Sequence, residues 1–194
     1  MARARAQIPP EAYGVGLNVL EPTPLPDTDL VDAANRGDAA AMRALYFRYR
    51  DWVYGQAIRM VGTHDDAIDV VQEAFIYFFG KFPRLTLTSQ IKTFLYPVVR
   101  NLSLNVLTAR RKVVSLGGHD VEKIPNGRSS GSNRHEFDDL IKGLGEDEQE
   151  ILILRFVEEF SLKEIAETLS IPLGTVKSRL HRALAHVRPL LTGQ

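Results

Sequence analysis

The chain has 194 residues, of which 44% are hydrophobic and 25% are charged, and its formal net charge at pH 7 is zero. This composition is typical of a globular protein with one large or two small domains. The chain has no cysteine, which excludes disulfides and thiolate metal sites, and no apolar run long enough for a membrane span or a signal peptide. We therefore expect a cytoplasmic protein.

The N-terminal part is predicted to be an extension followed by two helices. Residues 1–28 hold five of the ten prolines and show no regular apolar spacing, so we expect them to be disordered. Asp29 can cap a short helix over residues 30–36. Asp38 can cap a longer helix, whose apolar residues recur at helical spacing as far as Gly62.

The next predicted helix has two contrasting faces. Acidic residues stand at its start, as the helix dipole prefers, and Pro83 stops it. Its apolar stripe consists of Ala67, Val70, Val71, Ala74, Phe75 and Phe78. The opposite face presents a compact polar patch of Asp66, Asp69, Gln72, Glu73 and Tyr77. Plain solubility is enough to explain this patch.

A fourth helix is expected from about Ser89. It ends in a basic run, Arg110-Arg111-Lys112. Its core positions are Ile91, Phe94, Leu95, Val98 and Leu102. Pro97 lies inside it and removes one backbone hydrogen bond at a cost of about 3 kcal/mol, so we expect a kink or two shorter helices. The basic run, together with Lys92 and Arg100, is suited to bind phosphates.

Residues 113–135 are rich in Gly, Ser, Asn and Pro and are predicted to be a flexible linker. The linker separates an N-terminal domain, residues 29–112, from a C-terminal domain, residues 136–194. The first domain has 12 basic and 8 acidic residues, and the second has 7 basic and 11 acidic ones. The bases of the second domain gather in its final helix. One surface of this domain is therefore suited to bind DNA, and a second surface is suited to bind a protein. A solvated acidic face is the equal alternative.

The C-terminal domain is expected to begin with a short helix over residues 136–144 and a longer one over residues 147–158. The longer helix would pack four apolar residues on the elements that follow, namely Ile151, Leu152, Leu154 and Phe156. Residues 160–188 are then predicted to form a helix-turn-helix, in which Ser161 and Glu164 make a capping box. The apolar stripe of its first helix is Leu162, Ile165, Ala166 and Leu169.

The last helix is expected after a turn at Pro172, with Thr175 as its cap. Its apolar face consists of Val176, Leu180, Ala183, Leu184 and Val187. Its other face presents Lys177, Ser178, His181 and Arg182. A basic and polar face on a helix held by a packed partner suits the major groove of DNA. The alternative is a solvated face on an ordinary helical hairpin.

Three segments of the chain, in this order, resemble the extracytoplasmic-function (ECF) sigma factors, which are minimal two-domain sigma subunits of bacterial RNA polymerase. The segments are DDAIDVVQEAFIYFF at Asp65–Phe79, IKTFLYPVVRNLSLNVLTARRK at Ile91–Lys112 and EDEQEILILRFVEEFSLKEIAETLSIPLGTVKSRLHRAL at Glu146–Leu184. The resemblance implies an all-α fold of two small helical domains joined by a flexible linker, the C-terminal one a helix-turn-helix. It also implies a transcription initiation factor that binds core RNA polymerase and directs it to promoters through their −35 and −10 elements.

The resemblance further implies roles for particular residues. The clamp helices of the polymerase β′ subunit would bind Asp66, Asp69, Gln72 and Glu73. The −35 element would be read by Thr175, Lys177, Ser178, Arg179, His181 and Arg182. The −10 element would be bound by Lys81, Arg84, Lys92, Arg100, Asn101, Asn105, Arg110, Arg111 and Lys112. The loop at residues 81–89 would take up a flipped-out base, whose extrusion costs a few kcal/mol.

Two further partners are implied by the resemblance: the β flap of the polymerase, and an anti-sigma factor that holds the protein inactive. The chain departs from the family pattern at Ile68, where an acid is usual, so its polymerase-binding patch has one charge fewer. It departs again near Pro97 and Thr108, where an arginine is usual. Fewer cations there imply fewer phosphate contacts and a weaker dependence of DNA affinity on salt.

Two other classes of protein account for less of the chain. A stand-alone helix-turn-helix regulator would explain the C-terminal motif but not the N-terminal domain, which has no recognisable phosphoacceptor pattern. An enzyme is disfavoured because the five histidines are dispersed and no glycine-rich phosphate loop or Ser, His and Asp arrangement stands out. We therefore expect no catalytic residue, no metal and no cofactor.

Overall fold

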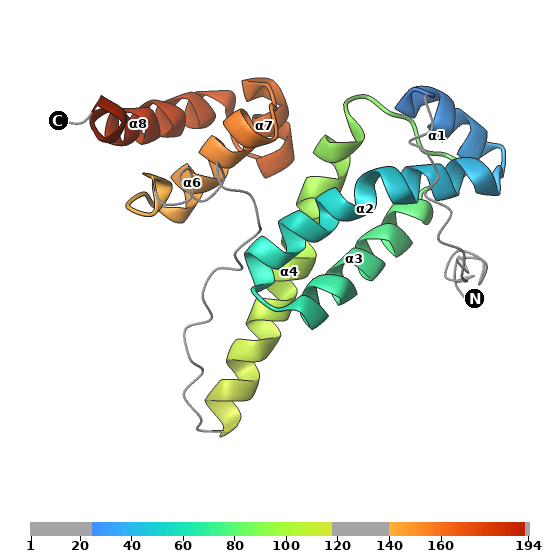
Figure 1. Ribbon diagram of the computed structural model, residues 1–194, viewed down its shortest axis with the longest axis horizontal. Helices are drawn as coiled ribbons and strands as arrows, with labels where there is room; N and C mark the ends of the chain where they lie inside the picture. Colours follow the sequence, from blue (N-terminus) through green and yellow to red (C-terminus); the bar gives the residue numbers. More distant parts are fainter. Residues whose placement is uncertain (1–24, 118–139, 193–194) are drawn as a thin grey trace. The chain divides into compact units, whose positions relative to one another are not determined.

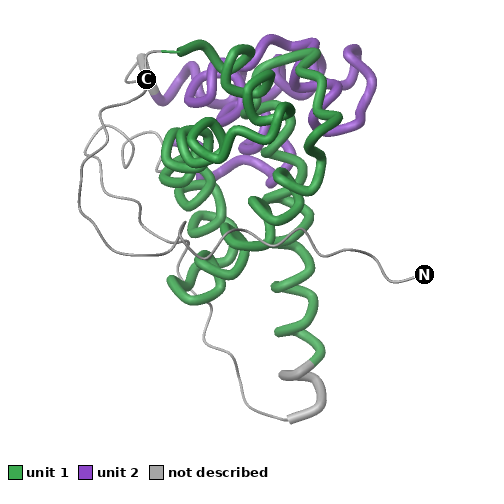
Figure 2. Tube along the Cα trace, turned by 90° about the vertical axis from the view of Figure 1, so that its right-hand side faces the viewer, with its two compact units in different colours: residues 1–127 green, residues 128–194 purple. Residues whose placement is uncertain are grey.

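The computed structural model describes residues 25–117 and 140–192, and all regular elements in these ranges are helical. This confirms the all-α class predicted from the sequence. The chain divides into two compact units, unit 1 at residues 1–127 and unit 2 at residues 128–194 (Figure 2). Unit 1 contains α1 (Asp27–Asn35), α2 (Ala39–Val61), α3 (His64–Phe79) and α4 (Ile91–Gly117) (Figure 1). Unit 2 contains α6 (Glu146–Leu152), the π-helical segment η2 (Ile153–Val157), α7 (Leu162–Leu169) and α8 (Leu173–Thr192).

Helix α1 begins earlier than predicted. It starts at Asp27, so it includes the last two residues of the expected extension. Pro26 precedes it with a φ of −58°, which suits entry into a helix, and the charges of Asp27 and Asp29 favour the helix N-terminus. Gly37, with a φ of 87°, then turns the chain toward α2. The predicted cap of α2 is confirmed, because the Asp38 side chain accepts two hydrogen bonds from backbone N–H groups of the first turn.

The core of unit 1 lies where α2 packs against α1, α3 and α4. The predicted apolar stripe of α3 is confirmed, since all six of its residues are buried: Ala67, Val70, Val71, Ala74, Phe75 and Phe78. On α4, Ile91 and Leu95 are buried as predicted, but Val99 is buried in place of Val98. Three other predicted core positions of α4 are only partly buried, namely Phe94, Val98 and Leu102.

The sequence predicts a kink or two shorter helices at Pro97. Helix α4 is continuous through this residue, so the second alternative is wrong. The side chains of Leu95, Tyr96 and Val99 near this proline are all buried. Burial of an apolar side chain contributes about 1.5–3 kcal/mol, and three such residues outweigh the roughly 3 kcal/mol lost at an interior proline. The helix continues to Gly117, so the first part of the predicted linker is helical. Residues 118–135 of that prediction lie outside the described residues.

The first long helix of unit 2 changes its winding halfway. The predicted α-helix over residues 147–158 is an α-helix only as far as Leu152, where η2 follows. A π-helical turn holds more residues than an α-helical turn, so the side chains beyond it are rotated away from the expected positions. Phe156 was predicted to be buried and is 53% exposed, whereas Phe160 is fully buried. The other predicted core residues are buried: Ile151, Leu152 and Leu154.

The start of the helix-turn-helix is confirmed in detail. The N–H of Glu164 donates to Ser161 Oγ (3.2 Å) and the N–H of Ser161 donates to the Glu164 carboxylate (2.8 Å), which completes the capping box. Helix α8 begins at Leu173, so Thr175 lies within its first turn and the prediction of Thr175 as the cap is wrong. Of the short helix expected over residues 136–144, residues 136–139 lie outside the described residues, and residues 140–141 are helical.

Candidate functional site

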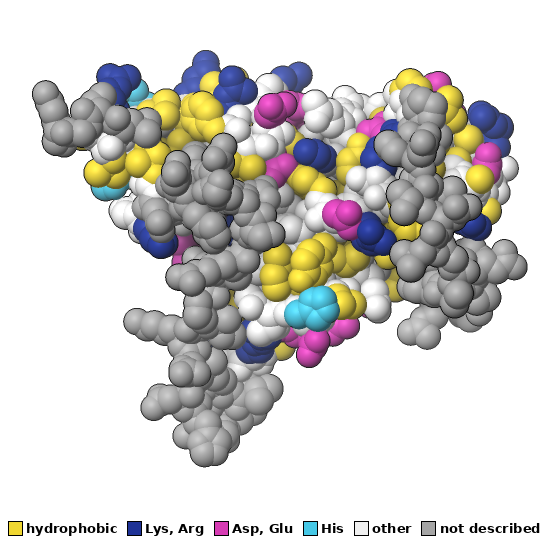
Figure 3. Space-filling model, viewed as in Figure 1, with side chains coloured by type: hydrophobic (Ala, Val, Ile, Leu, Met, Phe, Trp, Pro, Cys, Tyr) yellow, Lys and Arg dark blue, Asp and Glu magenta, His cyan; other side chains and the backbone are white. Residues whose placement is uncertain are grey.

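One face of α8 is buried and the opposite face is exposed. Helix α8 packs against α6 and α7, and Val176, Ala183 and Val187 are buried there as predicted. Leu184 is exposed instead of buried, because it lies about 100° around the helix from Ala183. The exposed face presents the predicted residues Lys177, Ser178, His181 and Arg182. Figure 3 shows Lys and Arg side chains over α8 on the face in view.

Two arginines of α8 contact acidic residues of α6. The guanidinium of Arg179 lies 2.8 Å from the Asp147 carboxylate, and Arg182 Nε lies 3.4 Å from the Glu148 carboxylate. The Arg179 side chain is 26% exposed, whereas that of Arg182 is 65% exposed. Arg179 therefore holds α8 against α6, and Arg182 keeps most of its side chain accessible to a ligand. Thr175, the remaining residue predicted for this face, is half-buried.

The residues predicted for the −10 element lie on α4 and in the loop before it. Six of these nine residues are exposed: Lys81, Arg84, Asn101, Asn105, Arg111 and Lys112. Lys92 and Arg100 are half-buried. The ammonium group of Lys81 lies 4.1 Å from the centroid of the Tyr77 ring, and that of Lys92 lies 5.5 Å from the centroid of the Trp52 ring. Cation–π contacts contribute about 0.5–1 kcal/mol at exposed sites, so these rings help to position both lysines.

Arg110 is turned toward the protein. Its guanidinium donates hydrogen bonds to the carbonyl of Val61 (3.1 Å) and to Thr63 Oγ1 (2.6 Å), and it forms an ion pair with Asp66. Thr63 Oγ1 in turn donates to the Asp66 carboxylate (2.7 Å). Arg110 thus joins α4 to the end of α2 and to the first turn of α3. No sequence pattern indicates this contact, because Arg110 and Thr63 are 47 residues apart along the chain.

The polar patch of α3 is divided by this contact. Asp69, Gln72 and Glu73 are exposed, as a binding surface requires. Asp66 is partly buried, because its carboxylate pairs with Arg110 and accepts the hydrogen bond from Thr63. The accessible part of the patch therefore carries two carboxylates, those of Asp69 and Glu73.

Neither a metal site nor a membrane span is found in the described parts of the chain. Among residues 25–117 and 140–192, no group of three or more His, Cys, Asp and Glu side chains is arranged to hold a metal ion. Over the same residues, no helix combines the length and the apolar character that a membrane span requires.

Two family models match the chain, one within each unit. The model for Sigma-70 region 2 matches residues 45–113, and the model for Sigma-70, region 4 matches residues 134–187. Among curated proteins, the ECF RNA polymerase sigma-E factor of Haemophilus influenzae is 33% identical over 174 residues, which cover 82% of this chain and 92% of the relative. The ECF RNA polymerase sigma factor SigW of Bacillus subtilis is 26% identical, with coverage of 83% of this chain and 94% of the relative.

A similar fold occurs in the sigma factor RpoE from Bartonella quintana, whose structure was solved in complex with the anti-sigma factor NepR. This structure has a TM-score of 0.59 and 24% sequence identity, and the match covers 76% of this chain and 94% of that one. Regions 2 and 4 in this order define the sigma subunit class. The chain belongs to the extracytoplasmic-function family of RNA polymerase sigma factors, as the sequence resemblance predicted. Members of this family are transcription initiation factors that direct RNA polymerase to promoters, rather than catalysts.

Proposed function

We propose that the two units of this sigma factor bind one promoter at two places while core RNA polymerase carries both. Helix α8 of unit 2 reads the −35 element. Helix α4 of unit 1 and the loop before it bind and melt the −10 element. The protein acts in the cytoplasm, needs no cofactor and performs no catalysis of its own.

The exposed face of α8 is the observation that supports this proposal most strongly. A recognition helix needs one face held by packed partners and the other free to enter the major groove. Val176 and Ala183 are buried on one side of α8, while Lys177 and Arg182 are exposed on the other. Arg182 can donate to the acceptors of a guanine edge, and Lys177 can contact a phosphate. Arg179 contributes through its ion pair with Asp147, which fixes the helix that carries them.

In unit 1 the exposed basic residues of α4 and of the loop before it are the proposed phosphate contacts. Arg111 and Lys112 are exposed there, and Arg84 is exposed in the loop before α4. Each cation that neutralises a phosphate releases a counterion, so this group makes DNA affinity depend on salt. Arg110 has a different part in this proposal. Because it pairs with Asp66, it holds α4 against α3 instead of binding a phosphate.

The exposed carboxylates of α3 are the proposed contact with the clamp helices of β′, and unit 2 is the proposed contact with the β flap. Asp69 and Glu73 are exposed on α3. An anti-sigma factor is proposed to hold the protein inactive by covering such surfaces. The similar fold of a sigma factor solved together with an anti-sigma factor supports this last point.

Asp69→Arg tests the polymerase contact. Charge reversal at this exposed position should abolish binding to core polymerase, because it replaces a carboxylate of the proposed interface with a cation, and it should leave the fold intact. Competition with another sigma subunit for purified core enzyme measures this effect. Unchanged competition by the variant would show that the patch is assigned wrongly.

Arg182→Ala tests base readout. Run-off transcription with purified core polymerase on a randomised promoter library should show a loss of about 1–3 kcal/mol and relaxed preference at one −35 position. Lys177→Ala is the matched control, because loss of a phosphate contact weakens all sequences about equally. A uniform loss for Arg182→Ala would exclude base readout by this residue.

A stand-alone regulator is the competing function, and co-purification separates the two. A sigma subunit should travel with core polymerase and direct where transcription starts. A regulator would shift promoter DNA alone and leave the start-site choice of the polymerase unchanged.

A further inference from the structure

The side chain of Asn35, the last residue of α1, pairs with a loop that lies 50 residues further along the chain. Its amide N–H donates to the carbonyl of Leu85 (2.8 Å), and its amide carbonyl accepts from the N–H of Leu85 (3.1 Å). One side chain thus satisfies both backbone groups of Leu85, as a neighbouring strand would. Leu85 is buried, and a buried backbone group without a partner is costly. Asn35 therefore fixes the loop backbone at this residue.

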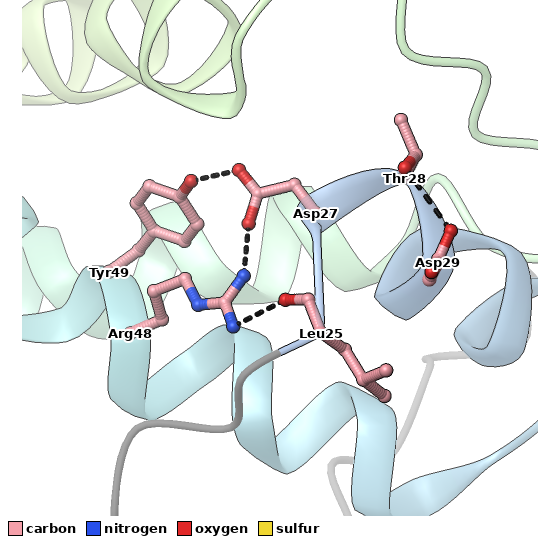
Figure 4. Close-up of polar contacts among 6 residues, drawn as sticks. All are labelled: Leu25, Asp27, Thr28, Asp29, Arg48 and Tyr49. Atoms are coloured by element: carbon pink, nitrogen blue, oxygen red, sulfur yellow. Dashed lines mark hydrogen bonds and ion pairs between the residues drawn. The ribbon is translucent and has the colours of Figure 1, made fainter.

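Helix α1, which carries Asn35, is held in place at both its apolar face and its first turn. Its apolar face is buried in the core of unit 1 and consists of Leu30, Val31 and Ala34. At the other end of the helix, Asp27 pairs with Arg48 (2.6 Å) and accepts a hydrogen bond from the hydroxyl of Tyr49, both on α2 (Figure 4). Helix α1 lies outside the region 2 match at residues 45–113.

The residues on both sides of Leu85 face outward. Arg84 and Thr86 are exposed, while Leu85 between them is buried. The exposure of the two neighbours shows that their side chains lie away from the core that Leu85 enters. The backbone position of Leu85 consequently sets where Arg84 and Thr86 stand. Both side chains are accessible to a ligand.

We propose that Asn35 is a positioning residue that sets the base preference of the loop between α3 and α4 at the −10 element. The inference rests on the proposed function of this loop, which is to take up a flipped-out base. An extruded base is read by hydrogen bonds to its edge, and such bonds need donors and acceptors held in place. A loop that is not tied at Leu85 would accept several bases in this position.

Asn35→Asp is the sharpest variant, because it keeps the size of the side chain and one acceptor but removes the donor to the Leu85 carbonyl. Asn35→Ala removes both hydrogen bonds. Transcription by core polymerase with each variant is measured on all single-base variants of one −10 element. Preference at a single position is typically about 5- to 150-fold. In the Asn35 variants, the preference should fall toward unity at the −10 position whose base the loop takes up. The preferences at the other −10 positions and at the −35 element should stay unchanged.

Asp27→Asn is the matched control at the other end of α1. It weakens the bonds to Arg48 and Tyr49 but leaves the contact with Leu85 intact. This control should keep the wild-type base preference. If both Asn35 variants also keep it, or lose transcription equally on all −10 variants, the inference is wrong. If wild-type transcription shows no −10 preference at all, the proposed function of the loop fails instead.

Hydrogen exchange tests the inference on the wild-type chain, so it does not depend on the folding of a variant. In the full-length wild-type chain, the N–H of Leu85 is expected to exchange at least about tenfold more slowly than that of the exposed Thr86, because it is bonded to Asn35. Equal exchange at the two amides would overturn the inference. Fluorescence of Trp52, the single tryptophan of the chain, verifies that unit 1 of each variant is folded.

Discussion

The two units differ in the size of the hydrophobic core that holds the helices with exposed basic residues. Unit 1 packs four helices around an extended core in which the rings of Phe75 and Phe78 are fully buried. Unit 2 packs α6 and α7 on α8, and it has fewer buried hydrophobic residues among those described, with Leu152, Phe160 and Ala183 among them. Unit 2 therefore depends on each of its core side chains and caps more heavily than unit 1 does.

The arginines of the two units differ accordingly. Arg110 of unit 1 is 30% exposed and engages a carbonyl, a hydroxyl and a carboxylate, whereas Arg182 of unit 2 is 65% exposed and engages one carboxylate. A basic residue of a helix thus serves the fold where several acceptors surround it. It stays available to a ligand where few acceptors lie within reach. The acceptors around an arginine, and not the arginine side chain alone, therefore determine whether it stabilises the fold or is available to a ligand.

Phe160→Ala should have the largest effect and tests how much unit 2 depends on one side chain. Phe160 is fully buried, so its truncation should cost about 3–5 kcal/mol and unfold unit 2. Phe156→Ala is the control, since this residue is 53% exposed and should cost well under about 1 kcal/mol. Hydrogen exchange at the amides of Ile165 and Val176 measures both. Equal costs would mean that the π-helical segment η2 does not exist in solution.

Arg110→Ala should destabilise unit 1 by about 2 kcal/mol, because it removes charge-assisted hydrogen bonds and leaves Asp66 without its ion pair. Arg111→Ala is the matched control at an exposed neighbour and should stay within about 0.5 kcal/mol. Denaturant unfolding followed by the fluorescence of Trp52 reports on unit 1 alone, because unit 2 has no tryptophan. If Arg110→Ala weakens only promoter binding, its proposed role in holding α4 is wrong.

Ser161→Ala should destabilise unit 2 by about 1 kcal/mol, since it removes the side-chain half of the capping box. Thr175→Ala is the comparison, because Thr175 was expected to cap α8 and does not. Thr175 lies inside the first turn of α8, so in the absence of DNA this change should alter the free energy of unfolding by roughly a few tenths of a kcal/mol at most. Hydrogen exchange within α7 and α8 is the measurement. A larger loss of stability for Thr175→Ala would show that α8 does not begin at Leu173 in solution.

A pH titration tests the anchor of α1 and should show the smallest effect. Burial, with a hydrogen bond to Asp27, raises the pKa of the Tyr49 phenol above its ordinary value of 10.0. Above that pH the unfolded chain loses this proton before the folded chain does, so the contribution of Tyr49 to stability is complete below pH 10 and declines above it. The decline should be about 0.8 kcal/mol half a pH unit above the unfolded pKa.

Tyr49→Phe supplies the comparison for this titration. The stability difference between the wild type and Tyr49→Phe should be constant from about pH 7 to pH 9 and should shrink above pH 10, in the direction that follows from a raised pKa. Unfolding curves followed by Trp52 fluorescence measure the difference. A difference that stays constant through pH 11 would contradict the raised pKa.

Local patterns in the sequence predicted the helices and several of their ends. The caps at Asp38 and Ser161 and the buried stripe of α3 depend on residues a few positions apart, so periodicity and capping patterns suffice to find them. The π-helical segment η2 carries no such pattern, so Phe156 within it was assigned to the buried side of the helix although it is exposed. The continuity of α4 through Pro97 depends on tertiary burial, which outweighs local propensity.

The candidate site was predictable as a set of residue types but not as a set of contacts. Lys177 and Arg182 were placed correctly on the exposed face of α8, because a helix in a packed motif must turn its polar face outward. The partners of Arg110 and Arg179 lie far away in the chain, and those of Asn35 lie in another loop. Such contacts follow from how helices pack, which no single stretch of sequence encodes.

The continuation of α4 to Gly117 bears on which promoters the protein accepts. Residues 113–117 were expected to be part of the tether between the units, yet as a helix they rise only about 1.5 Å each, against roughly 3.4 Å in an extended chain. The maximum reach of the tether is therefore shorter by about 10 Å. Because base pairs stack about 3.4 Å apart, this equals about three base pairs of spacer DNA. The longest spacer that still permits simultaneous contact is shorter by that amount than the sequence alone would allow.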